Sequence, residues 1–475
     1  MVLPERSVST IISSFSSGVI ERILSLRNAR ILLVAVFIAW LCWQIASAYP
    51  GVPTPDTCRQ LEEGLSGKYT NWKPTLYSWF LGAADSLLPG HGIAASFLLQ
   101  LAGLGWGVFT ITWSLIRRHV GYSLLIFILP LFFTQKGMCI YYVGNDALAA
   151  ACYLCFIGSS MMTSDTEGHR SRVIGFIFCA IFAFAGISLR HNALPLMFLL
   201  IFWACRRLNR TVIISALASA VSLAVLTGAS LLLTYGILRA EASYPLKSPF
   251  ADDIVNLDIL EGRWSEICLL NGSEHLPAPH DMCKLSADVP NFGCPLNPYG
   301  RIDDPVEREK DYRAFRHAWL TSVCSHPERY VLLKIFFFHQ NLLIGRSLPI
   351  FNDMILARYP HVTIRNDGPS RQWYPYVCRE FFVLSGLPLI SYATLLLLLA
   401  VPRRHHRISD YPQPRRDALS IIGASLLYTS TFTLLTLSST ELRYYVIRAS
   451  LCAVGIGILF LSAVLHRNDQ QIEAQ

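Results

Sequence analysis

The chain has 475 residues, of which 53% are hydrophobic and only 15% are charged. An ordinary soluble domain carries roughly 25% charged residues. Together with a mean hydropathy of +0.40, this composition excludes a soluble globule of this size, a disordered chain and a small secreted scaffold. The net charge of +8 fits either nucleic-acid binding or basic cytoplasmic loops. The positions of the charges must decide between nucleic-acid binding and basic loops. From the composition we expect an all-α polytopic membrane protein.

Long apolar segments recur along the chain. A helix needs about 20 mostly apolar residues to cross a bilayer, and ten segments approach this length. The segments that begin at 121, 173 and 192 are short and would need tilt or local thinning of the bilayer. The sequence thus predicts about ten transmembrane helices, at 31–48, 93–115, 121–135, 142–162, 173–189, 192–205, 211–236, 379–401, 418–439 and 445–465.

Basic residues alternate between the ends of these segments. If the N-terminus is cytoplasmic, every second loop should be basic under the positive-inside rule. Basic clusters do follow the second, fourth, sixth, eighth and tenth segments, beginning at Arg117, Arg170, Arg206, Arg403 and Arg467. The net charge therefore indicates topology and not a nucleic-acid footprint. Both termini are expected in the cytoplasm, and the first segment, which lacks a clear cleavage site, is expected to remain as a span.

This topology leaves two segments outside, 49–92 and 237–378, and divides the chain into three parts. These are an N-terminal transmembrane module at 1–236, an extracytoplasmic segment of mixed soluble character at 237–378, and C-terminal helices at 379–475. Four cysteines cluster in the extracytoplasmic segment, where one or two disulfides of undetermined pairing are expected: Cys268, Cys283, Cys294 and Cys324. The run 330–345 is either an eleventh span or an amphipathic surface helix, and the basic loop at 403–416 favours the surface helix.

Ionisable residues gather at the outer ends of the spans, where such groups are often functional. Asp56 follows the first span after three prolines that stiffen the chain, and Asp146 begins the fourth span. Both acids have a structural alternative as helix N-caps. The other outer groups have an alternative as interfacial anchors, and they are Arg190, His191 and Asn192 after the fifth span and Glu441, Arg443 and Tyr444 before the last.

Carboxylates and arginines on one face suit the transfer of a group from a phosphate-linked donor. A carboxylate can activate an acceptor hydroxyl as general base, and an arginine can clamp the phosphate and stabilise its charge as it leaves. Nucleotide sugars are scarce outside the cell, so the donor would be a lipid phosphate. On this hypothesis Asp56 and Asp146 are catalytic, and Arg443 or Arg190 holds the donor phosphate.

The first outer loop carries a resemblance to a known group. The string Pro55-Asp56-Thr57…Gln60…Gly67-Lys68-Tyr69-Thr70-Asn71-Trp72-Lys73-Pro74 resembles the Pro-Asp-[Ser/Thr]…Gln…Gly-x-[Tyr/Phe]-x-x-Trp-His-Pro pattern of bacterial GT-C superfamily membrane glycosyltransferases. Lys73 stands where that pattern has His, and Thr57 stands where the family has a second acid. Further similar elements are Asn145-Asp146, Arg190-His191-Asn192, Ala318-Trp319…His326-Pro327-x-x-Tyr330 and Glu441-Leu442-Arg443-Tyr444.

The resemblance implies a GT-C-like fold in a bacterial inner (plasma) membrane, a polyprenyl-phosphate sugar donor, and an envelope glycan or lipid as acceptor on the outer face. It implies that Asp56 is the catalytic carboxylate, with Asp146 as the second. Substrate-binding roles are expected for Gln60, Trp72, Lys73, His191, Glu441 and Tyr444. No cofactor is required by this scheme, and a divalent metal remains open.

Two other functions are consistent with the same topology. A transporter or flippase of lipid-linked glycans would favour inverted repeats and broken helices near mid-membrane, and the sequence shows no matching halves. A glycan polymerase or ligase would differ in using a diphosphate-linked oligosaccharide, and the sequence does not distinguish the donors.

Overall fold

The computed structural model of the chain describes residues 26–133, 142–166, 168–208, 211–246, 249–250, 253–254, 257, 304–343, 387–400, 412–435 and 445–473. The predictions made for Glu441, Arg443 and Tyr444 fall outside these residues. So do those for three of the four clustered cysteines, Cys268, Cys283 and Cys294.

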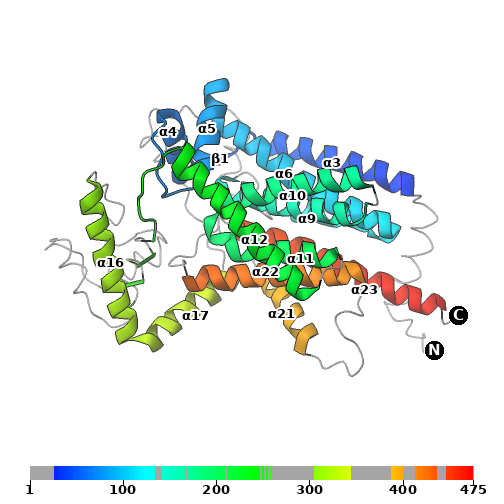
Figure 1. Cartoon of the computed structure of the whole chain (residues 1–475). Helices are drawn as coiled ribbons and strands as arrows, with labels where there is room; N and C mark the ends of the chain where they lie inside the picture. Colours follow the sequence, from blue (N-terminus) through cyan, green and yellow to red (C-terminus); the bar gives the residue numbers. More distant parts are fainter. Residues whose placement is uncertain are drawn as a thin grey trace, which may run out of the picture.

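Helices occur at all ten positions where the sequence predicts an apolar span, and most of them run along a common axis (Figure 1). Neighbouring helices pack directly on one another, with α9 against α6 and α10, α22 against α23, and α11 against α12 and α22. They are α3 (Leu26–Ala48), α6 (Gly92–Arg118), η1 with α7 (Val120–Leu124 and Leu125–Phe132), α9 (Asn145–Ser164), α10 (His169–Leu189), α11 (Leu194–Arg207), α12 with the π-helix η3 (Val212–Leu231 and Leu232–Ile237), α21 (Leu387–Ala400), α22 (Gln413–Leu435) and α23 (Tyr445–Glu473).

Within the described part of the chain, six helices are long and apolar enough to cross a membrane: α3, α6, α9, α10, α12 with η3, and α23. The protein is therefore an integral membrane protein. The apolar helices at Val120–Leu129 and Pro388–Leu398 are shorter, α11 has 14 residues, and α22 begins with the charged residues Arg415, Arg416 and Asp417. The total of about ten spans remains a prediction.

Helix α9 lies at the centre of the bundle and is buried along nearly its whole length. Small residues allow transmembrane helices to approach closely, and Gly103 and Gly107 of α6 face α9 in this way. A Cβ atom at Gly107 would lie 2.5 Å from the Cβ of Leu154, so no larger side chain fits there. The middle of α9 is thereby held in close contact with α6.

A short parallel sheet joins residues 49–92, which we call the first outer loop after their predicted side of the membrane, to the start of α9. Strand β1 (Val52–Pro53) pairs with β2 (Tyr142–Val143), with Val52 opposite Tyr142 and Pro53 opposite Val143. Because β1 leads into α4 (Pro55–Ser66) and β2 leads into α9, the N-termini of these two helices are held side by side.

Helices α4 and α5 (Thr75–Leu87) form a tight hairpin in the first outer loop. Helix α4 ends at Gly67, whose φ of +67° lies in the left-handed region that glycine favours. The hairpin crosses at Gly64 and Gly82 with the two backbones in contact, since a Cβ at Gly64 would lie 2.1 Å from the carbonyl oxygen of Ser78. This crossing fixes the loop between the helices, residues 67–74.

Two further helices, α16 (Pro305–Ser325) and α17 (Pro327–Leu343), belong to the segment 237–378, which we call the second outer segment after its predicted side. They lie at the same end as α4 and α5 (Figure 1). Helix α3 begins and α23 ends at the opposite end. Helix α17 covers most of the predicted amphipathic run 330–345 and packs on α21 and α22. Cys324 is an exposed free thiol in α16, so the described structure does not assign it to a disulfide.

Candidate active site

The two predicted carboxylates occupy equivalent positions in two neighbouring helices. Asp56 is the second residue of α4 and Asp146 is the second residue of α9. Asp56 comes three residues after Pro53, and Asp146 comes three residues after Val143. Pro53 and Val143 lie opposite each other in the sheet. The hydroxyl of Thr57 donates a hydrogen bond of 2.6 Å to the carbonyl of Val143, which ties the helix starts together. A carboxylate in the first turn interacts favourably with the helix dipole.

Neither acid is an N-cap, so the structural alternative for both residues is wrong. The cap of α4 is Thr54, whose hydroxyl accepts a hydrogen bond from the Thr57 amide at 3.1 Å. The cap position of α9 is Gly144, which has no side chain to accept a bond. Both carboxylates are therefore available for interactions outside their own helix termini.

Asp56 forms an ion pair with Lys73. The Lys73 Nζ lies 2.7 Å from Asp56 Oδ2, and the side chains are 20% and 27% exposed. Lys73 stands where the GT-C pattern has His, and the sequence alone assigns it no partner. The structure places its ammonium directly on the candidate catalytic carboxylate, in a position that solvent or a ligand can reach.

Asp146 forms a second ion pair, with Arg190, at 2.8 Å between Oδ1 and Nη1. This pair is buried, since the side chains are 2% and 13% exposed. Arg190 follows the last residue of α10, where its amide donates to the carbonyl of Gly186. Asp146 is thus the partner of a buried arginine and is much less accessible than Asp56.

The other predicted substrate-binding residues in the described part differ in exposure. Gln60 is fully buried, and its Nε2 donates to the carbonyl of Pro74 at 3.4 Å. Trp72 is half-buried, whereas His191 is exposed in the short 3-10 helix η2 (His191–Ala193). Gln60 and Trp72 belong to the same hairpin as Asp56 and Lys73. His191 directly follows Arg190.

Glu63 lies on the same helix as Asp56 and Gln60 and is not among the candidates that the sequence analysis selected. It accepts hydrogen bonds from the hydroxyls of Thr70 at 2.8 Å and Ser78 at 3.0 Å. Burial raises the pKa of the Glu63 carboxyl, and these hydrogen bonds offset part of that rise. The spacing of Asp56, Gln60 and Glu63 along α4 would have revealed it, because residues at i, i+4 and i+7 share one face of a helix.

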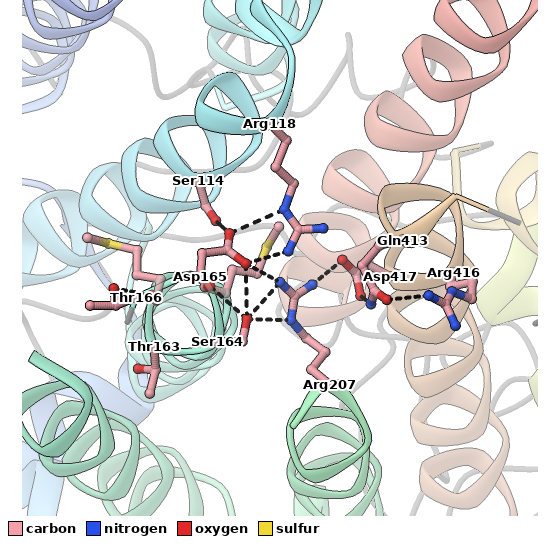
Figure 2. Close-up of polar contacts among 12 residues, drawn as sticks. Ser114, Arg118, Thr163, Ser164, Asp165, Thr166, Arg207, Gln413, Arg416 and Asp417 are labelled. Carbon is pink, nitrogen blue, oxygen red and sulfur yellow. Dashed lines mark hydrogen bonds and ion pairs between the residues drawn. The ribbon is translucent and has the colours of Figure 1, made fainter. Parts of the chain in front are cut away.

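A separate cluster of charges lies at the C-terminal end of α9 (Figure 2). Asp165, directly after α9, accepts hydrogen bonds from Ser114 at 2.6 Å and from the Arg118 Nε at 3.2 Å. Arg207 bridges Asp165 and the fully buried Asp417. Burial alone would raise the pKa of Asp165, but the bonds from Arg118 and Ser114 outweigh it and hold that pKa below its ordinary value.

This inner cluster, Arg118, Asp165, Arg207 and Asp417, balances two positive charges with two negative ones. Asp417 also accepts from the Trp203 indole at 3.0 Å and from Gln413 at 2.7 Å. Its buried carboxylate therefore has several partners, as a structural ion pair requires. The cluster ties α6, α9, α11 and α22 together and lies far along the bundle from the Asp56 site.

In the described part of the chain, no three His, Cys, Asp or Glu side chains are grouped so that they could hold a metal ion.

No family model and no curated protein matches the chain. Among solved structures, the chain is similar to the crystal structure of ArnT from Cupriavidus metallidurans bound to undecaprenyl phosphate. The match has a TM-score of 0.32 and 14% sequence identity, and it covers 90% of this chain and 77% of that chain. At this identity and score the function has to rest on the geometry of the site itself.

Proposed function

We propose that the protein is a GT-C type glycosyltransferase that moves a sugar from a polyprenyl phosphate to an envelope glycan or lipid on the outer face of the inner membrane. The observation that carries this proposal is the accessible Asp56–Lys73 ion pair, held by paired strands next to the buried Asp146–Arg190 pair. One end of a membrane-embedded bundle then offers a carboxylate and two cations to a ligand that approaches along the bilayer.

Asp56 is the general base in this scheme. Its carboxylate takes the proton of the acceptor hydroxyl as the acceptor oxygen attacks the anomeric carbon of the sugar. The bond between that carbon and the phosphate oxygen breaks, and its electron pair leaves on the polyprenyl phosphate. Displacement from the opposite side inverts the anomeric configuration.

Lys73 and Arg190 stabilise the departing phosphate. A lysine ammonium binds phosphate as a point charge and an arginine binds it through a planar fork. Lys73 is 20% exposed and can exchange its contact with Asp56 for one with the phosphate. Arg190 is oriented by Asp146, so we assign Asp146 to holding this guanidinium in place. Glu441, Arg443 and Tyr444 keep the roles that the sequence suggests for them, as proposals.

The experiment is a transfer assay with the purified full-length protein in lipid nanodiscs. A panel of polyprenyl-phosphate sugars is offered with an envelope lipid and glycan extract, and the product is identified by mass spectrometry. The proposal requires a new glycosidic bond and release of polyprenyl phosphate. Transfer only from a diphosphate-linked oligosaccharide would favour a polymerase or ligase. Movement of a lipid-linked glycan across a liposome membrane without bond formation would favour a flippase.

A further inference from the structure

The loop between α4 and α5, residues 67–74, is tied to a part of the chain more than 160 residues away. Asn71 lies two residues before Lys73 and is the centre of this contact. The backbone amide of Asn71 donates to the backbone carbonyl of Glu241 at 3.0 Å. The backbone amide of Glu241 donates to the backbone carbonyl of Tyr69 at 2.9 Å. These two bonds form a parallel bridge between the loop and the segment that follows η3.

The Asn71 side chain uses both its acceptor and its donor in the same contact. Its Oδ1 accepts from the amide and the hydroxyl of Ser243, at 2.6 and 2.7 Å. Its Nδ2 donates to the hydroxyl of Tyr235 in η3 at 2.8 Å. The side-chain oxygen of an asparagine can accept two hydrogen bonds while its NH2 group donates. An ionised aspartate can only accept.

Lys73 is thereby held between fixed points on both sides. On the N-terminal side, Asn71 is bound as described and Thr70 donates to Glu63. On the C-terminal side, Pro74 has a restricted φ and its carbonyl accepts from Gln60. The backbone of Lys73 has little freedom between these anchors, so the position of its ammonium depends on them.

The same contact extends to α16. Arg308 of α16 donates to the carbonyl of Ala242 at 2.8 Å and lies 3.5 Å from a carboxylate oxygen of Glu241. Residues 241–243 are therefore held on one side by the loop that carries Lys73 and on the other by α16.

We propose that Asn71 is a positioning residue that sets the Lys73 ammonium against Asp56. It does so by docking the loop onto residues 235–243, which α16 supports through Arg308. This inference rests on the proposed function, because it gives Lys73 a role in binding the donor phosphate. It predicts that Asn71 acts through Lys73 and does not merely stabilise the loop.

A double-mutant cycle between Asn71 and Lys73 separates these roles. A misplacement of 1 Å can lower a catalytic rate by about 10²-fold, so Asn71→Ala should lower kcat by about 10–100-fold. In a Lys73→Met background the same change should cost little more, because the group that it positions is already gone. Losses that multiply in the double variant would overturn the proposal and leave Asn71 with a general structural role.

The donor side of the contact has its own test. Tyr235→Phe removes the bond between Asn71 and Tyr235, so it should lower kcat in the wild type but cost little more in an Asn71→Ala background. Ser66→Ala is a matched control, because Ser66, the last residue of α4, makes hydrogen bonds to Glu63 and Lys68 but none to residues 235–243 in the described structure. It should leave kcat near the wild-type value.

Two measurements keep the test independent of transfer. Hydrogen exchange should become faster at residues 69–73 and at residues 241–243 in Asn71→Ala, but not in Ser66→Ala. Thermal stabilisation by undecaprenyl phosphate alone should be lost in Asn71→Ala and in Lys73→Met alike. If the wild-type protein neither transfers sugar nor responds to this lipid, the proposed function fails. If the wild type responds and Asn71→Ala responds equally, the inference about Asn71 fails while the function stands.

Discussion

Asp56 and Asp146 hold the same place in two helices that start from paired strands, yet their environments are opposite. The Asp56 side chain is 27% exposed and contacts a lysine, while that of Asp146 is 2% exposed and contacts a buried arginine. The parallel pairing of Pro53 with Val143 brings the two helix starts together. The geometry thus separates a carboxylate that a substrate can reach from one that orients a neighbouring cation.

Removing the charge of Asp146 should destabilise the protein. Asp146→Asn leaves the Arg190 guanidinium buried without its carboxylate, and breaking a buried ion pair by removing one partner costs about 3–5 kcal/mol. Denaturant unfolding in detergent would measure the loss. A double variant with Arg190→Gln should recover part of the stability, and additive losses would show that the two residues do not interact.

The inner cluster should matter for stability and not for chemistry. Asp417→Asn leaves Arg207 facing a neutral amide in a buried site, so a loss of about 3–5 kcal/mol is expected. Transfer activity per folded molecule should stay at the wild-type level, because Asp165 of this cluster follows the C-terminus of α9, whereas the helix of Asp56 starts beside the N-terminus of α9. A normal melting temperature combined with a large fall in kcat would contradict this assignment.

Glu63 should make the stability of the outer hairpin depend on pH. Because burial raises the pKa of Glu63 in the folded protein above its ordinary value of 4.5, the folded state binds the proton more tightly than the unfolded state. That contribution is present below about pH 4.5 and is lost as the pH rises through the folded pKa.

Glu63→Gln cannot ionise, so its melting temperature relative to wild type should increase as the pH is raised from 4 to 7. Thermal unfolding of the two proteins across this range provides the measurement. Glu62→Gln, at an exposed position next to it, serves as control and should show no such trend. A constant difference between Glu63→Gln and wild type would exclude Glu63 as the source of the pH dependence.

The topology predicts which positions an impermeant thiol reagent can reach in intact cells. On a cysteine-free background, a cysteine at Lys68 in the first outer loop should be labelled. One at Arg117, at the inner end of α6, should be labelled only after the cells are opened. Both side chains are exposed, so accessibility alone does not distinguish them. The reverse pattern would invert the orientation and place the Asp56 site in the cytoplasm.

The positions of the apolar helices could be predicted because hydrophobic length is a local property of the sequence. The N-cap interpretation of Asp56 failed for a local reason as well. Thr54 precedes it by two residues with an extended backbone, and it takes the cap position with Pro55 as the first helical residue.

The partners of the charged residues could not be predicted, because they depend on contacts between distant segments. Lys73 meets Asp56 only because α4 and α5 cross at Gly64 and Gly82. Arg207 meets Asp417 across 210 residues of sequence. Sequence reasoning selected Asp56, Asp146 and Arg190 as candidates from their positions at span ends, and it gave no means of deciding which acid would pair with which cation.

The most direct test of the central claim is the transfer rate of Asp56→Asn in the full-length protein, compared with Glu62→Gln on the same helix. Asparagine preserves the size of the side chain but cannot accept the acceptor proton, and losing a general base typically lowers the rate by about 10²–10⁴-fold. We expect that loss in Asp56→Asn, with undecaprenyl phosphate binding retained, and a near wild-type rate in Glu62→Gln. Full transfer activity in a normally folded Asp56→Asn protein would contradict the account and remove Asp56 from the mechanism.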